Sequence, residues 1–328
     1  TDEGGSIRVP ASSCGVFGLK PSRGRNPIGP DFSWEYEGQS TSHIVSRTVR
    51  DTAAMLDATA GAEPGSPYVA PGRTDFLAAL GEDLGRLRIG ISTAVEVFGV
   101  PMEPPCVEAV HATGRLLQQS GHIVEEVKLP YDEWEVLRTA FILGATNTAA
   151  VVAKLEVKYG RPEVRQSLED VLLLLAAVGR ALPAEVVGSS RLAGLRVGLA
   201  LAQFHEQHDL LVTPTLGRVP VPLDQAEPSP SERRLLHFLA SPAAARILHV
   251  PRLRERVMDT QMEVLSRQVL HRTMVANVTG VPAMSVPLFR TEHDLPIGVQ
   301  FIGRVGDEAT LLQLAAQLEE AKPWRVRR

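Results

Sequence analysis

The residues most suited to chemistry in this 328-residue chain lie at its start, in the segment Asp2-Glu3-Gly4-Gly5-Ser6. Two adjacent glycines allow positive φ angles, so the backbone can turn tightly and approach a ligand closely. Successive N–H groups in such a turn can converge on an anion, and Ser6 places a hydroxyl beside them. This arrangement suits acyl transfer, because fixed donors stabilise the oxyanion of a tetrahedral intermediate. Taken alone, the segment is more typical of a plain tight turn with a solvent-facing serine.

A longer pattern around this segment changes that interpretation. The residues from Asp2 to Ala11 and from Cys14 to Arg25 closely resemble the amidase signature family. The resemblance continues in family order at residues 46–51, 56–61, 209–215, 277–283 and 295–300, and it is weak over 133–208 and 218–270. The matches span nearly the whole chain, and the first block is the most specific of them.

The resemblance implies a reaction and a set of site residues. Members of this family hydrolyse amides with a Ser–cis-Ser–Lys triad, and Ser6 matches the nucleophile. The backbone N–H groups of Glu3, Gly4, Gly5 and Ser6 match the oxyanion loop of the family. The position of Glu3 varies in the family, so the resemblance assigns its side chain no role.

The base and the bridging cis-serine of the family both lie upstream of this loop, outside these 328 residues. Lys20 matches the structural Gly-Leu-Lys-Pro segment and not the base. A serine needs a base to lose its proton, and a lysine base must be buried to be neutral near pH 7. We therefore expect the chain to be the larger C-terminal part of an amidase and to be inactive alone. Asp2 and Arg8 match the flanking charges of the motif, which favours a structural ion pair.

Two further positions are candidates for a substrate pocket. His43 and residues 62–71 resemble the branch of the family labelled 6-aminohexanoate-cyclic-dimer hydrolase. Linear amides, aryl acylamides, lactam-like cyclic amides and carbamates all remain open as substrates. A loose alignment with that branch places Asn147 near the pocket. The alternatives are a structural histidine at position 43 and a polar helix residue at position 147.

Composition narrows the choice of partner and cofactor. The chain has 34 Lys and Arg against 38 Asp and Glu, a net charge of −4, which does not favour nucleic acid as a partner. Cys14 and Cys106 show no disulfide or zinc pattern, and Cys14 is expected to be a small buried residue. His205 and His208 are one residue short of the zincin spacing. We expect no metal, no cofactor, a small-molecule amide substrate, no membrane span, a cytoplasmic location and a plausible homodimer.

Periodicity predicts an α/β fold. Residues 87–91, 103–120 and 122–127 form a strand, a helix and a strand, which indicates a parallel βαβ unit. Further strands are expected at 16–19, 210–212, 283–288 and 297–302, with helices at 48–61, 133–208, 231–275 and 308–320. We expect one α/β/α sandwich with a large mixed, partly parallel sheet and helices on both faces. Its segments are a catalytic loop and signature region at 1–61, the βαβ unit at 62–132, a mainly helical part at 133–275, and C-terminal strands and helix at 276–328.

Two other functions stay open from the sequence. One is the glutamine-hydrolysing A subunit of a tRNA-dependent amidotransferase, which shares the signature. The other is a non-catalytic binding module that keeps the fold without the upstream lysine.

Overall fold

The chain is built around one seven-stranded sheet. The computed structural model describes residues 1–29, 35–93, 101–222, 230–267 and 271–324. The strand order is β2-β1-β6-β7-β5-β3-β4. The strands are β1 (Phe17–Lys20), β2 (Val45–Ser46), β3 (Arg88–Ile91), β4 (Ile123–Glu126), β5 (Leu210–Pro214), β6 (Ala283–Arg290) and β7 (Pro296–Ile302).

The sheet is mixed, as the sequence predicts. Strand β3 pairs in parallel with β4 and β5, whereas β1, β2, β6, β7 and β5 join through antiparallel pairs. The parallel pair β3–β4 is connected by helix α4 (Pro104–Gln119), which confirms the predicted βαβ unit. Gly121, at a φ of 94°, provides the turn between α4 and β4.

One face of the sheet is covered by α2 (Val49–Thr59), α3 (Phe76–Ala79), α4 and α14 (Glu308–Ala321). Alternate strand residues such as Phe17, Leu19 and Val299 point into this layer and are fully buried. A side-chain cap marks the start of α2, where the Thr48 hydroxyl accepts from the backbone N–H of Asp51 at 3.1 Å. This face holds the largest apolar core.

The opposite face carries α1 (Arg8–Cys14), α13 (His271–Thr279) and the ends of α5 (Glu133–Tyr159) and α8 (Ala184–Phe204). Small residues allow α1 to lie close to the strands. A Cβ added to Gly18 would lie 2.7 Å from the Cβ of Ala11, and one added to Gly298 would lie 2.7 Å from the Cβ of Ser12. Helices therefore cover both faces, which confirms the predicted sandwich.

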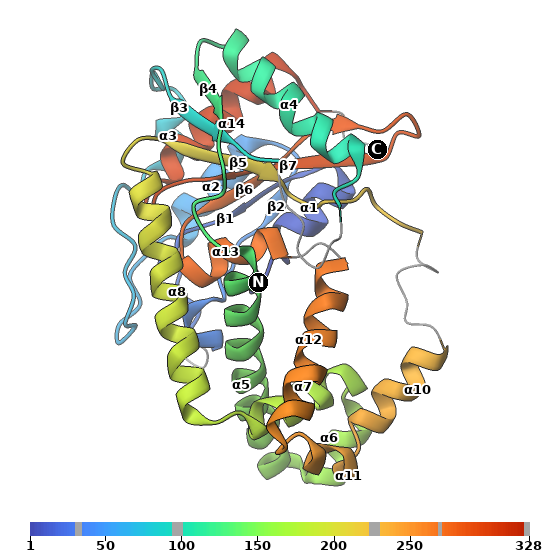
Figure 1. Ribbon diagram of the computed structural model, residues 1–328. Coiled ribbons are helices and arrows are strands. Elements are labelled where there is room, and N and C mark those ends of the chain that lie inside the picture. The colour runs from blue at the N-terminus through green and yellow to red at the C-terminus, as the bar shows by residue number, and fades with distance from the viewer. Residues whose placement is uncertain (30–34, 94–100, 223–229, 268–270, 325–328) are drawn as a thin grey trace.

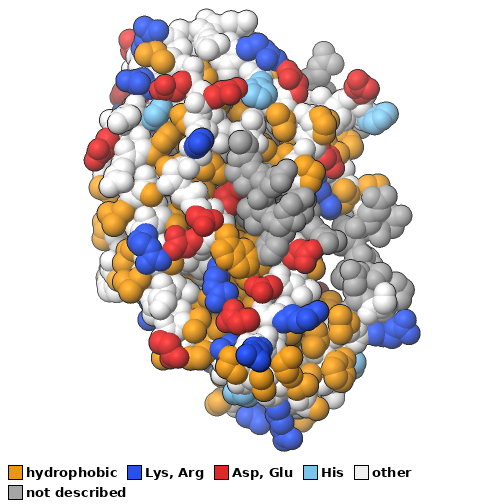
Figure 2. All heavy atoms as spheres, viewed as in Figure 1, with side chains coloured by type: hydrophobic (Ala, Val, Ile, Leu, Met, Phe, Trp, Pro, Cys, Tyr) orange, Lys and Arg blue, Asp and Glu red, His pale blue; other side chains and the backbone are white. Residues whose placement is uncertain are grey.

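A helical layer extends away from the sheet (Figure 1). It consists of α5, α6 (Arg161–Ser167), α7 (Asp170–Ala181), α8, α10 (Pro230–Leu239), α11 (Pro242–Ile247) and α12 (Pro251–Arg267). These helices enclose a second apolar core, in which Leu137 and Ile142 of α5 meet Met258 and Met262 of α12. Figure 2 shows apolar side chains exposed on the lower surface of this layer.

Several details differ from the sequence predictions. Residues 8–14 form helix α1, although the small residues and Pro10 predicted no helix there. Cys14 is exposed, so the expectation that it is buried is wrong, whereas Cys106 is buried. Helix α13 crosses the expected boundary between residues 275 and 276. The sequence also predicts a proline-rich loop at residues 220–230, and part of that loop lies outside the described residues.

Helix α5 bears on the expectation that the chain has no membrane span, and it is weak evidence against that expectation. By length and composition alone, this helix of 27 residues could cross a membrane. However, 61% of its apolar 18-residue stretch is buried inside the protein. The helix packs against α7, α8 and α13, so its apolar residues serve the core.

Candidate active site

The loop formed by Asp2 to Ile7 leads directly into helix α1 and carries Ser6 on the surface. The backbone C=O of Gly5 accepts from the N–H of Val9 at 2.7 Å, which joins the loop to the first turn of the helix. Ser6 is exposed, and Gly5 beneath it is buried. The nucleophile predicted from the sequence is therefore accessible to a substrate.

The Asp2 carboxylate organises this loop. Its Oδ1 accepts from the backbone N–H of Gly5 at 2.7 Å, and its Oδ2 accepts from the backbone N–H of Ile7 at 3.2 Å. The Arg8 guanidinium donates to both oxygens, from Nη2 at 2.9 Å and from Nε at 3.0 Å, and both side chains are fully buried. Burial alone would raise the pKa of Asp2, but the Arg8 charge and the hydrogen bonds from Arg8 and Asn277 hold it far below its ordinary value. The predicted structural ion pair is thus present.

Arg8 connects the loop to two distant elements. Its Nη1 donates to the backbone C=O of Thr273 in α13 at 2.6 Å and to Oε1 of Gln300 in β7 at 2.9 Å. Its Nη2 donates to Oδ1 of Asn277 at 2.6 Å, and Nδ2 of Asn277 donates back to the carboxylate and backbone C=O of Asp2 at 2.9 and 2.8 Å. The sheet and α13 together hold the ion pair.

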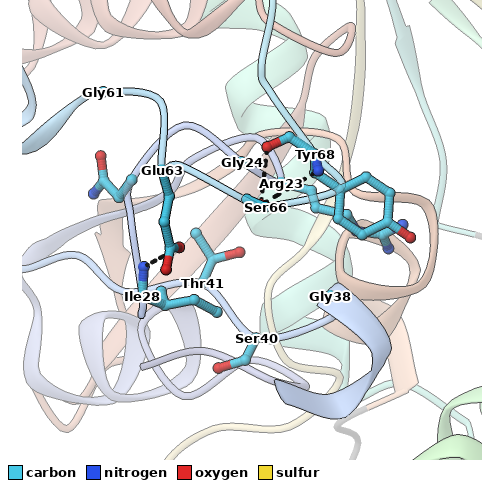
Figure 3. Close-up of a pocket in the computed structure, with 11 residues that line it drawn as sticks. Arg23, Gly24, Ile28, Gly38, Ser40, Thr41, Gly61, Glu63, Ser66 and Tyr68 are labelled. Carbon is cyan, nitrogen blue, oxygen red and sulfur yellow. Dashed lines mark hydrogen bonds between the residues drawn. The ribbon is translucent and has the colours of Figure 1, made fainter. Parts of the chain in front are cut away.

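A second strand-like segment lies against the start of the chain. Asp2 and Thr41 form an antiparallel bridge, with N–H to C=O distances of 2.8 and 3.1 Å. Thr41 and Ser40 also line a small polar cavity of about 20 Å³ (Figure 3), which is bounded by Arg23, Gly24, Asn26, Ile28, Gly38, Gly61, Glu63, Ser66 and Tyr68. That volume holds about one water molecule, so this cavity is too small to be a substrate pocket.

A glycine is needed at position 5 because α13 lies directly behind it. Gly5 has a φ of 136°, and a Cβ placed there would come within 2.4 Å of the Thr273 hydroxyl oxygen. A Cβ on Gly4 would meet Met274 at 3.6 Å. The Thr273 hydroxyl donates to the backbone C=O of Gly4. A side chain at position 5 would push the loop away from α13.

These contacts divide the predicted oxyanion donors into two groups. The Gly5 N–H donates to the Asp2 carboxylate in this structure, and its role in the oxyanion loop stays a prediction. Among the described residues, nothing accepts from the backbone N–H of Gly4 or of Ser6. The N–H groups on either side of the Gly4–Gly5 peptide therefore remain available to an anion, and Glu3 is half-buried beside them.

Lys20 lies within the fold and not on the loop. Its side chain is fully buried, and its Nζ donates to the backbone C=O of Pro21 at 2.6 Å. Burial, and then the charge of Arg8, lower the pKa of Lys20 to about 7. This placement agrees with the structural role that the sequence indicates.

The two candidate pocket residues are not joined to Ser6 by a described contact. His43 is half-buried, and its surroundings include Thr52 of α2 and Glu308 of α14, on the sheet face opposite α13. Burial lowers the pKa of His43 to about 4, so its ring is neutral at pH 7. Asn147 is half-buried midway along α5, and its buried Nδ2 has no hydrogen-bond partner in the described part of the chain. Both assignments stay predictions.

Three residues that hold the loop in place were not predicted from the sequence. Thr273, Asn277 and Gln300 contact Asp2, Arg8 or the glycines, although the motif assigned them no role. A usable signal existed for two of them. Asn277 lies between the apolar residues Ala276 and Val278, and Gln300 lies between Val299 and Phe301 in a buried strand.

Within this α/β fold, the loop places an exposed serine beside backbone N–H groups that donate to no described residue. The family model named Amidase matches residues 1–245 and 231–312. The 6-aminohexanoate-cyclic-dimer hydrolases of Paenarthrobacter ureafaciens and of Pseudomonas sp. (strain NK87) are each 31% identical over 100% of this chain and 63% of their own length. The chain belongs to the amidase family, and it spans about 63% of the length of these curated relatives.

Solved structures agree with this assignment. The structure of 6-aminohexanoate cyclic dimer hydrolase complexed with substrate matches with a TM-score of 0.81 at 28% identity, covering 99% of this chain and 64% of that one. A bacterial aryl acylamidase of the amidase signature family matches with a TM-score of 0.74 at 23% identity, covering 98% of this chain and 61% of that one. The second likeness supports the fold alone.

Proposed function

We propose that this protein hydrolyses the amide bond of a small non-peptide molecule through an acyl-enzyme on Ser6. The observation that carries the proposal is the loop geometry. An exposed serine is flanked by free N–H groups on a backbone that a buried ion pair and α13 hold in place. Such a loop is organised before a substrate arrives, which is what electrostatic stabilisation of an oxyanion requires.

The proposed reaction has two steps. The Ser6 hydroxyl oxygen attacks the amide carbonyl carbon, and the resulting oxyanion receives hydrogen bonds from the N–H groups of Gly4 and Ser6. The hydroxyl proton passes to the leaving amine as the C–N bond breaks, through the cis-serine and lysine that the family resemblance implies outside these residues. Water then attacks the acyl group, the carboxylic acid leaves, and the Ser6 hydroxyl is restored.

The substrate class follows from the relatives. Two of them are named for a cyclic dimer of 6-aminohexanoate, and the structure of one of that name contains its substrate. We propose a small amide of linear, aryl or lactam-like type, with carbamates included because they react through the same tetrahedral intermediate. No nucleic acid, cofactor or membrane takes part in this proposal. The cytoplasmic location and the homodimer stay predictions.

The two alternative functions have no specific observation in their favour. An amidotransferase subunit would hydrolyse glutamine in particular, so turnover of glutamine distinguishes it from the proposed function. A non-catalytic module would not need its serine exposed or its neighbouring N–H groups free, yet both conditions hold here.

Turnover of an amide panel tests the proposal. The panel contains an aryl acylamide, a linear aliphatic amide, a cyclic amide, a carbamate and glutamine. It is applied to the longest natural form of the protein that contains these residues. We expect hydrolysis of at least one non-glutamine amide and its loss in Ser6→Ala. Activity that survives in Ser6→Ala, or activity on glutamine alone, would contradict the proposal.

A further inference from the structure

The peptide between Gly4 and Gly5 is held at both of its polar ends. Its N–H donates to Oδ1 of Asp2 at 2.7 Å, and its C=O accepts from the Thr273 hydroxyl. Two hydrogen bonds at opposite ends fix the plane of a peptide, because rotation of that plane would break both. The two free N–H groups, of Gly4 and Ser6, belong to the peptides on either side of this fixed plane. Their directions are therefore set by how the Gly4–Gly5 peptide is held.

Thr273 is itself fixed by the same network that holds the ion pair. Its backbone C=O accepts from Nη1 of Arg8 at 2.6 Å. The backbone C=O of the preceding residue, Arg272, accepts from Nε2 of Gln300 at 3.1 Å. One turn further along α13, Asn277 contacts both members of the ion pair. The Thr273 hydroxyl thus stands at a defined place behind the loop.

Thr273 packs tightly against Gly5 of the loop. A Cβ on Gly5 would come within 2.9 Å of the Thr273 Cβ as well as within 2.4 Å of its hydroxyl. A valine at position 273 would keep this packing shape but would remove the donor to Gly4. A serine would keep the donor but would lose one methyl group. Packing and hydrogen bonding at this position can therefore be separated by substitution.

We propose that Thr273 is a positioning residue for the reaction. Its hydroxyl fixes the Gly4–Gly5 peptide so that the N–H groups of Gly4 and Ser6 point to the oxyanion. The role rests on the proposed function of Ser6, and it concerns the transition state rather than substrate binding. Because the donors act on charge that develops only during the reaction, disorder in them lowers kcat and leaves KM nearly unchanged.

Three variants test this role in the longest natural form of the protein: Thr273→Val, Thr273→Ser and Ser6→Ala. Removing one oxyanion donor outright costs about 100- to 1,000-fold in kcat in other enzymes, so loss of a residue that orients donors is expected to cost about 10- to 100-fold. We expect that decrease in Thr273→Val, with KM within about twofold of the parent. Thr273→Ser is expected to stay within about threefold of the parent in kcat. Near-ultraviolet circular dichroism and the urea midpoint of each variant establish that it is folded.

A second readout does not depend on turnover. Backbone hydrogen exchange at Gly5 reports whether its N–H still donates to Asp2. We expect faster exchange in Thr273→Val and parent-like exchange in Thr273→Ser, with Ser6→Ala also unchanged. This measurement keeps the inference testable if the protein hydrolyses none of the amides tried, an outcome that would count against the proposed function alone.

Three results would overturn the role of Thr273. One is a folded Thr273→Val with parental kcat. Another is an equal loss of kcat in the valine and serine variants, which would assign the effect to packing. The third is unchanged Gly5 exchange in Thr273→Val. Activity that survives in Ser6→Ala would instead reject the proposed nucleophile.

Discussion

At the scale of single residues, the molecule is defined by a buried charge pair that holds a surface loop. Asp2 and Arg8 are both fully buried, and each makes further hydrogen bonds that satisfy its polar atoms. Such a pair is compatible with a stable fold only while both charges are present, because removal of one charge leaves the other buried without compensation. Loss of either charge should therefore also disturb the conformation of the loop.

Asp2→Asn tests this dependence. We expect it to lower the free energy of unfolding by about 3–5 kcal/mol, because the Arg8 charge stays buried without its partner. The surface pair of Arg73 and Asp75 provides the matched control, since the Asp75 side chain is 64% exposed and Asp75→Asn should change the free energy of unfolding far less. Urea unfolding at pH 7 measures both variants. Equal costs would show that the buried pair is no more important than a surface pair.

The conformation of Gly5 gives a second prediction at this scale. Gly5→Ala combines an unfavourable φ of 136° with a collision at the Thr273 hydroxyl, so we expect loss of both stability and turnover. Gly85 also has a positive φ, 66°, but no atom of the described residues lies within 4 Å of a Cβ placed there. Gly85→Ala should cost only about 1–2 kcal/mol and leave turnover unchanged. Paired melting curves and activity assays would reject the account if Gly5→Ala behaved like Gly85→Ala.

At the scale of elements, close packing of helices depends on particular glycines. In α7, a Cβ on Gly179 would lie 2.0 Å from the backbone C=O of Ala145 in α5, so the two helices touch through backbone. In α8, a Cβ on Gly188 would meet no atom within 4 Å in the part of the chain that the structure describes. The same residue type therefore serves packing in one helix and has no packing role in the other.

Alanine at these two positions should have opposite effects. Gly179→Ala is expected to destabilise the protein by about 1–3 kcal/mol or more, because α5 and α7 must move apart. Gly188→Ala should stabilise it by as much as about 1 kcal/mol, through helix propensity alone. Chemical denaturation of both variants checks the pair. Destabilisation by Gly188→Ala would show that α8 has a constraint that its contacts do not reveal.

Most of the elements could be predicted from sequence, because their signals are local. The βαβ unit of β3, α4 and β4 follows from periodicity and from Gly121, and α2 follows from its cap at Thr48. Helix α1 was missed because Pro10 and small side chains weaken its pattern, and packing on the sheet stabilises it instead. The residues that contact and hold the loop could not be predicted from their spacing in the sequence. Arg8 and Gln300 are 292 positions apart, and only the order of the strands brings them together.

At the scale of the whole molecule, a buried pair joins the helical layer to the part that holds the loop. Glu133, in the first turn of α5, lies 3.7 Å from Nη2 of Arg272 in α13, and both side chains are at most 3% exposed. Burial raises the pKa of Glu133 to about 7, Arg272 acts in the opposite direction, and Asp132 adds a smaller increase. The folded state therefore binds a proton at Glu133 more tightly than the unfolded state does.

The sign of the resulting pH dependence is fixed by this pKa. A carboxyl group whose pKa is raised from 4.5 to about 7 on folding contributes stability that is complete below pH 4.5 and is lost as pH rises through 7. Relative to Glu133→Gln, the parent should lose up to about 3 kcal/mol between pH 4.5 and 8. Urea midpoints of the two proteins across that range test this expectation. Parallel curves would show that Glu133 titrates at its ordinary pKa.

The central claim, that Ser6 is the acylated nucleophile, is tested most directly by trapping the acyl-enzyme. The longest natural form of the protein is mixed with an activated aryl ester, quenched in acid and mapped by peptide mass spectrometry. We predict one acyl group on Ser6, absent in Ser6→Ala and retained in Ser13→Ala, a matched change at the half-buried serine of α1. An acyl group on another residue, or on Ser6→Ala as readily as on the parent, would contradict it.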